Sequence, residues 1–140
     1  MDTGLSVEHG VSDPLDVFAA KEAVRAYQDR MHTVRNLPPT RFLRLLTQTR
    51  CLIGNSSAGI REASYLGVPV VNIGTRQQGR ERAANVIDVP YVLADIKAAI
   101  EYQTQKGKYP SSPLYGRGDA GQRIAEVLSE RVGDHSRKTA

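Results

Sequence analysis

Hydroxyl, carboxylate and guanidinium groups gather in one stretch of the chain, GNSSAGIREASYLGVPVVNIGTRQQGRER, which covers residues 54–82. At its start, Ser56 and Ser57 come directly after an apolar run and before a helical pattern. Hydroxyls in such a turn can cap the helix or donate hydrogen bonds to a phosphate oxygen, and Gly54 allows a ligand to approach the backbone. The turn is therefore a candidate anion site, with a plain strand-to-helix turn as the alternative.

Glu62 lies within the helical pattern that follows these serines. It is not the capping-box partner of either one, because Gly59 and Ile60 stand three residues after them. Helical side chains lean toward the N-terminus of their helix, so the carboxylate could reach the turn and accept hydrogen bonds from the vicinal hydroxyls of a ribose. Simple stabilisation of the helix dipole is the alternative.

Residues 74–82, GTRQQGRER, follow the next apolar run and are called the arginine loop below. Because the carboxyl ends of parallel strands share one edge of a sheet, this loop should lie beside the serines. The guanidinium groups of Arg76, Arg80 and Arg82 can bind phosphate oxygens in bidentate fashion. Alone, three arginines would indicate a solvated surface. Beside a second loop of complementary chemistry, they indicate a site for one anionic small molecule.

Other kinds of site are poorly supported. His9, His32 and His135 have neither metal-ligand spacing nor a relay partner, and Cys51 sits in an apolar run, as a packed core thiol would. The chain also lacks the hydrolase nucleophile elbow, the Walker lysine and the G-x-G-x-x-G pattern. We therefore expect no metal, no cofactor and no catalytic residue in this chain.

Strand-like and helix-like segments alternate along the chain, and two of the strand-like segments are continuously apolar, as buried parallel strands are. This order predicts an α/β fold with a Rossmann-like, doubly wound parallel sheet and helices on both faces. Such domains usually open on a strand, whereas this chain opens on a polar segment and a helix, so we expect the first strand to be missing. Helices are expected at residues 12–30, 37–49, 56–67, 93–107 and 119–132, and strands at 31–36, 50–55, 68–74 and 86–90.

The bulk composition excludes several classes of protein. With 140 residues, 40% of them hydrophobic, the chain can bury one core. We expect a polar lead at 1–13, one partial domain at 14–132 and a disordered tail at 133–140. No apolar run approaches the roughly 20 residues of a membrane span and no signal segment is present, which predicts a cytoplasmic protein without a membrane partner. The net charge of +4 is interleaved with acids, and aromatic residues are 6% with no Trp, which argues against a nucleic-acid partner.

The pattern of residues 54–89 resembles the C-terminal domain of the UDP-N-acetylglucosamine 2-epimerase family, in particular its hydrolysing branch, which serves sialic and related nonulosonic acid synthesis. The similarity is dense from about Val34 to Val89 and weaker through residues 109–128. The non-hydrolysing branch typically has a D-S-G-G form where NSSA stands here. The resemblance implies a Rossmann-like UDP-binding domain, the C-terminal half of a glycosyltransferase-B fold.

Carried over by motif, the resemblance assigns Ser56 and Ser57 to the diphosphate, Glu62 to the ribose hydroxyls and Arg76 to the diphosphate or the adjoining sugar. Phe42 matches the family position whose backbone lies against the uracil. Further candidates for the same site are Asn55, Arg80 and Glu81.

The family's hydrolysing reaction eliminates UDP from UDP-N-acetylglucosamine and hydrates the glycal-like intermediate to N-acetylmannosamine. The resemblance places the acid and base carboxylates on an N-terminal domain and an essential histidine near the start of the C-terminal one, and these 140 residues match neither region. We therefore expect UDP or UDP-N-acetylglucosamine as ligand, little or no turnover by the chain alone, and an N-terminal epimerase domain in another chain as partner. A non-catalytic UDP-sugar-binding module, half of a glycosyltransferase, and a homo-oligomer formed along an exposed sheet edge remain open.

Overall fold

The computed structural model describes residues 25–26 and 29–137, and the chain divides into two compact units, residues 1–42 and 43–140. Arg25 and Ala26 are helical, whereas the rest of the helix expected at 12–30 falls almost entirely outside the described residues. The strand expected at 31–36 is wrong. Those residues form no strand, and all but Met31 are exposed, so the alternating pattern here does not mark a strand with one buried face.

Helix α2 (Pro39–Gln48) begins just inside the first unit and ends in the second, which confirms the helix expected at 37–49. Proline suits its first position, because the missing N–H would have no partner inside the helix. Leu46 is its buried residue, and Lys108 donates a hydrogen bond of 2.8 Å to the Thr47 carbonyl at its C-terminal end.

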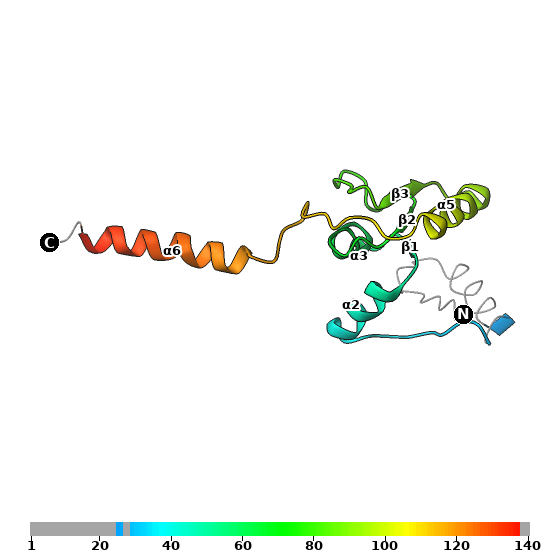
Figure 1. The fold of residues 1–140 in the computed structure, drawn as a ribbon, viewed down its shortest axis with the longest axis horizontal. Coiled ribbons are helices and arrows are strands. Elements are labelled where there is room, and N and C mark those ends of the chain that lie inside the picture. Colours follow the sequence, from blue (N-terminus) through cyan, green and yellow to red (C-terminus); the bar gives the residue numbers. More distant parts are fainter. Residues whose placement is uncertain (1–24, 27–28, 138–140) are drawn as a thin grey trace. The chain divides into compact units, whose positions relative to one another are not determined.

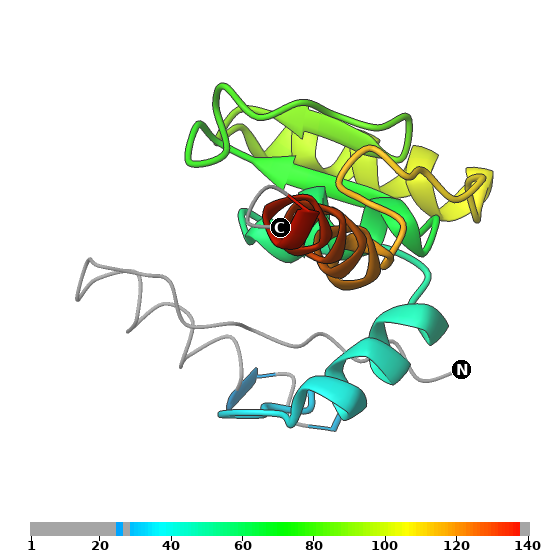
Figure 2. The same cartoon turned by 90° about the vertical axis from the view of Figure 1, so that its left-hand side faces the viewer.

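Three short strands form a parallel sheet in the order β1 (Leu52–Gly54), β2 (Val70–Ile73) and β3 (Val86–Val89) (Figures 1 and 2). All three lie within segments that the sequence predicted to be strands. In the register, Gly54 pairs with Asn72, and Asn72 pairs with Asp88. The carboxyl ends of the three strands therefore lie at the same edge of the sheet.

Helices cover both faces of this sheet. Neighbouring residues of a strand point to opposite faces, so Val70 and Val71 pack against different helices. Val70 faces α3 (Ser57–Ile60), where a carbon added to Gly59 would come 3.0 Å from its Cγ1 atom. Val71 points the other way and packs with Ala99 of α5 (Leu93–Lys106). The fold is α/β with a parallel, Rossmann-like sheet, as the alternating pattern predicted.

The helix expected at 56–67 is divided in two, with α4 (Glu62–Tyr65) following α3 after an interruption at Arg61. Arg61 has φ −98° and ψ −74°, away from regular helical geometry. Each piece buries two residues, which are Gly59 and Ile60 in α3, and Ala63 and Ser64 in α4. The second piece ends at Tyr65, two residues before the Gly67 that was expected to close the helix, and Gly67 has a φ of +64°, a left-handed conformation that glycine adopts most readily.

A buried network of polar side chains joins α4, β2 and α5. Gln103, which has no exposed surface, donates to the carbonyls of Val70 and Asn85 at 2.8 Å each and accepts from the Tyr109 hydroxyl at 2.7 Å. Ser64 donates to the Asn85 side chain at 2.9 Å. Every polar atom of Gln103 is thus paired, as a buried amide requires.

The segment 109–115, which follows α5, runs beside α4. The amide of Tyr109 donates to the Gly67 carbonyl at 2.9 Å, and that of Ser112 donates to the Ser64 carbonyl at 3.0 Å. Farther on, the Tyr115 hydroxyl donates to the Glu81 carbonyl at 2.8 Å. The segment therefore ties the end of α4 to the arginine loop.

Helix α6 (Ala120–Arg137) follows, so the boundary expected at 132 lies inside a helix. The helix predicted at 119–132 is confirmed, and its observed end is Arg137. Within the described part of the chain, none of the helices is long and apolar enough to cross a membrane.

Candidate functional site

The turn after β1, residues 54–57, is called the serine turn here. Ser56 takes an extended backbone conformation, φ −72° and ψ 144°, and its hydroxyl oxygen accepts a hydrogen bond of 3.3 Å from the Ala58 amide. A hydroxyl that accepts one bond can still donate another. Ser56 therefore caps α3 and keeps a proton with which it could bind an anion.

Ser57 and Glu62 stand at the starts of two successive short helices. Both residues are half-buried, Ser57 as the first residue of α3 and Glu62 as the first residue of α4. Because each helix has only four residues, its dipole is small, and side chains must carry any anion binding. The interruption at Arg61 puts the Glu62 carboxylate in a first turn, rather than one turn into a continuous helix as expected.

Arg76 joins the arginine loop to the serine turn. Its Nη1 atom lies 3.4 Å from Oδ1 of Asn55, an exposed and long hydrogen bond. Arg80 and Glu81 are also exposed in the loop, and the described residues give the Arg80 guanidinium no partner. The two loops thus lie side by side at the carboxyl edge of β1 and β2, as the order of strands predicted.

Arg82 has a different task from the other loop arginines. Its Nε atom lies 3.0 Å from Oδ2 of Asp88, and Asn72 donates to Oδ1 of the same carboxylate at 2.6 Å. Burial raises the pKa of the Asp88 carboxyl, but the hydrogen bonds from Arg82 and Asn72 and the charge of Arg82 outweigh it, so that pKa lies below its ordinary value. Arg82 therefore links the arginine loop to β3, and its positive charge is balanced by the Asp88 carboxylate.

Gln77 was not singled out from the sequence. Its side chain is 4% exposed, and its Nε2 atom donates a hydrogen bond of 2.7 Å to the main-chain carbonyl of Asn55. Its Oε1 atom is buried and has no partner among the described residues. Two glutamines stand side by side in the loop, and the other, Gln78, is exposed, so the residue pattern could not tell them apart.

The structure places six of the predicted residues in these two adjoining loops and Glu62 at the start of the short helix α4. Phe42 lies on α2, as the last residue of the first unit, so its contact with a base stays a prediction. The residues in the two loops are Asn55, Ser56, Ser57, Arg76, Arg80 and Glu81.

Cys51 is a half-buried thiol whose burial raises its pKa to about 11, so it is a poor nucleophile at neutral pH. Within the described residues, no group of three His, Cys, Asp or Glu side chains could hold a metal ion.

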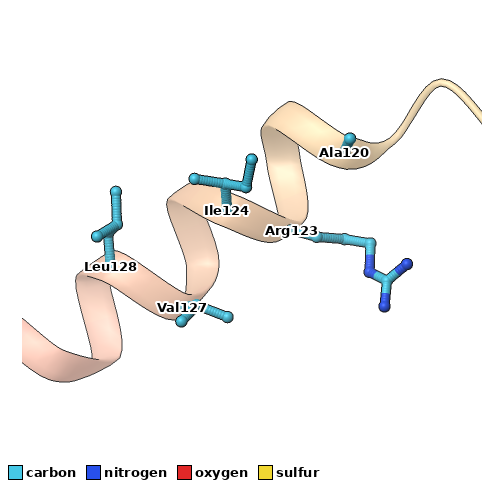
Figure 3. Close-up of a pocket in the computed structure, with 5 residues that line it drawn as sticks. All are labelled: Ala120, Arg123, Ile124, Val127 and Leu128. Carbon is cyan, nitrogen blue, oxygen red and sulfur yellow. The ribbon is translucent and has the colours of Figure 1, made fainter.

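A hollow of about 400 Å³ lies along α6 (Figure 3). None of the predicted site residues lines it. All its lining residues come from that one helix, and Ile124, Val127 and Leu128 among them are 59%, 52% and 58% exposed. One side of a single helix cannot enclose a small molecule, so this is an open apolar face rather than a ligand site.

Taken together, the fold and the two loops define part of an α/β protein with polar, cationic loops at the carboxyl edge of a parallel sheet. The model of the UDP-N-acetylglucosamine 2-epimerase family matches residues 10–129, and the chain belongs to that family.

Three relatives illustrate the similarity. A UDP-N-acetylglucosamine 2-epimerase of Neisseria meningitidis serogroup B is 38% identical over 91 residues, which are 63% of this chain and 24% of the relative. A UDP-N,N'-diacetylbacillosamine 2-epimerase (hydrolyzing) of Legionella pneumophila is 34% identical over 110 residues, 77% of this chain and 29% of the relative. The polysialic acid biosynthesis protein P7 of Escherichia coli is 51% identical over 49 residues, 35% of this chain and 12% of the relative. The chain spans less than a third of the length of each.

Proposed function

We propose that this chain is the UDP-binding part of a hydrolysing UDP-N-acetylglucosamine 2-epimerase, a C-terminal portion that holds the nucleotide of UDP-N-acetylglucosamine or a modified relative. The observation that carries the proposal is the contact between Arg76 and Asn55, because it brings hydroxyl and guanidinium groups together at one sheet edge. Family membership, and the printed name of the Legionella relative as a hydrolyzing enzyme, support the same choice.

Each side chain has a chemical task in this proposal. The hydroxyls of Ser56 and Ser57 donate to diphosphate oxygens, while Arg76 exchanges its long bond to Asn55 for a shorter, charge-assisted one to phosphate. The exposed Arg80 side chain adds a second positive charge to the arginine loop near the proposed diphosphate. The carboxylate of Glu62 accepts hydrogen bonds from the ribose hydroxyls, which distinguish a nucleotide from inorganic diphosphate.

Calorimetric titration of the 140-residue chain with UDP tests this function. We expect measurable binding that Arg76→Ala and Glu62→Ala each weaken about tenfold, because each removes hydrogen bonds that involve a charged group. Arg76→Ala should also weaken the binding of inorganic diphosphate. Glu62→Ala should leave diphosphate binding unchanged, because diphosphate has no ribose.

The matched controls lie outside the proposed site. Arg50 stands just before β1, at the opposite edge of the sheet, and Glu101 is an exposed residue of α5, so Arg50→Ala and Glu101→Ala should bind UDP like the unsubstituted chain. Absence of UDP binding by the folded chain, or equal losses in these controls, would contradict the proposed function.

A further inference from the structure

Among the described residues, two glutamines are almost completely buried, and their side chains are paired very differently. Gln103 is 0% exposed and makes three hydrogen bonds, so both ends of its amide are satisfied. Gln77 is 4% exposed and makes one, from Nε2 to the Asn55 carbonyl at 2.7 Å, while its Oε1 has no partner in the described part of the chain. A buried acceptor without a partner destabilises the folded chain.

The orientation of the Gln77 amide is determined by what it touches. Rotating the amide by half a turn would put Oε1 against the Asn55 carbonyl, where two acceptors would repel each other. An apolar side chain of similar length would fill the same space without leaving an orphaned oxygen. Compared with such an apolar side chain, glutamine adds an N–H donor, so its contribution at this position is the bond to Asn55.

That bond acts where the proposed diphosphate site is built. The Asn55 carbonyl directly precedes Ser56 and Ser57, whereas the other link between the two loops, from Arg76 to the Asn55 side chain, is exposed and 3.4 Å long. Phosphate binding would draw Arg76 away from Asn55. The buried bond from Gln77 would then be the remaining side-chain link described between the serine turn and the arginine loop.

We propose that Gln77 is a positioning residue for the diphosphate, holding the serine turn at a fixed separation from the arginine loop. This inference rests on the proposed function. It gives Gln77 no direct contact with the nucleotide. Its effect should therefore appear in the binding of the phosphates and not in the binding of the nucleoside.

Calorimetric titrations of the full chain with UDP and with uridine test the inference. Gln77→Met keeps a side chain of similar length and removes the donor, and we expect about a tenfold loss of UDP affinity with uridine affinity unchanged. Gln78→Met is the matched control, since it changes the exposed neighbour of the same type, and both affinities should stay as in the unsubstituted chain. Thermal unfolding by circular dichroism identifies which variants are folded. If Gln77→Met does not fold, Gln77→Asn replaces it, because its amide is one methylene too short to reach Asn55.

Amide hydrogen exchange of residues 54–58 gives a second readout that needs no ligand. Exchange there should be faster in Gln77→Met than in Gln78→Met, because the turn loses its buried tether. Unchanged UDP affinity in a folded Gln77 variant, equal losses for UDP and uridine, or unchanged exchange would each overturn the positioning role. If the unsubstituted chain binds no UDP, the proposed function fails, and the exchange rates still decide whether Gln77 holds the turn.

Discussion

At Gly59, helix α3 approaches β2 so closely that one added carbon would meet Val70. The distance from that carbon to the Val70 Cγ1 atom would be 3.0 Å, tighter than ordinary packing, and Ile60 beside it is fully buried. The serine turn begins the same helix, so its distance from the sheet depends on this contact. A side chain at residue 59 would therefore require Val70 to shift by a few tenths of an ångström.

We expect Gly59→Ala to lower the free energy of unfolding by about 1–3 kcal/mol, because overpacking outweighs the better helix propensity of alanine. Thermal or urea unfolding followed by circular dichroism measures the change. Gly121→Ala is the control, since a carbon added there meets nothing within 4 Å and lies in the helical residues of α6. Gly121→Ala should leave stability unchanged or raise it slightly, and equal losses in the two variants would contradict the packing argument.

At the scale of elements, the arginine loop is fastened to the sheet by the ion pair between Arg82 and Asp88. The folded pKa of Asp88 is lowered, so its contribution to stability is present above its unfolded pKa of about 3.9 and is lost as pH falls through the folded value. Asp88 is 48% exposed, which limits the size of the effect. The lowered pKa still means that Asp88 stabilises the fold more at neutral pH than in acid.

We expect Asp88→Asn to be less stable than the unsubstituted chain near pH 7, with the difference narrowing as pH falls from about 5 toward 3. Urea unfolding midpoints across this range measure it. Glu101→Gln, an exposed substitution on α5, serves as the control and should show no comparable narrowing. A stability difference for Asp88→Asn that stays constant with pH would show that the ion pair contributes nothing.

The elements predicted correctly from the sequence were the two continuously apolar strands β1 and β2, the short strand β3, and the helices with clear starts or a glycine end. Their order also predicted that the serine turn and the arginine loop adjoin. The interruption of the helix at Arg61 and the burial of the Gln77 side chain could not be predicted, because both depend on how polar residues fit against the packed sheet. Likewise, Arg82 was grouped with the ligand-binding arginines because the Asn72–Asp88 register is invisible in a linear pattern.

At the scale of the whole molecule, the chain spans 24% and 29% of the Neisseria and Legionella relatives. We propose that the nucleotide is held by this part, while the acid and base groups that move protons at the sugar belong to an N-terminal epimerase domain, in another chain or elsewhere. The open apolar face of α6 and the edges of the sheet leave a homo-oligomer as a further proposal.

We expect the 140-residue chain alone to bind UDP-N-acetylglucosamine without releasing UDP or N-acetylmannosamine, because general acid and base groups must face the sugar for elimination. A coupled assay for UDP, with chromatography of the sugar product, measures turnover. A full-length epimerase of the family is the positive control. Robust turnover by the isolated chain, retained after Arg50→Ala but lost after Arg76→Ala, would show that it carries its own proton-transfer groups.

The two loops of the candidate site come from residues 54–57 and 74–82, separated only by two short helices and β2. Many binding sites are assembled from segments scattered over a sequence, whereas here one uninterrupted stretch contains both loops of the candidate site. Such a stretch keeps its recognisable order of residues even in a chain that spans about a quarter of its relatives. It is also portable, so exchanging this single segment between family members would transfer the whole two-loop site at once.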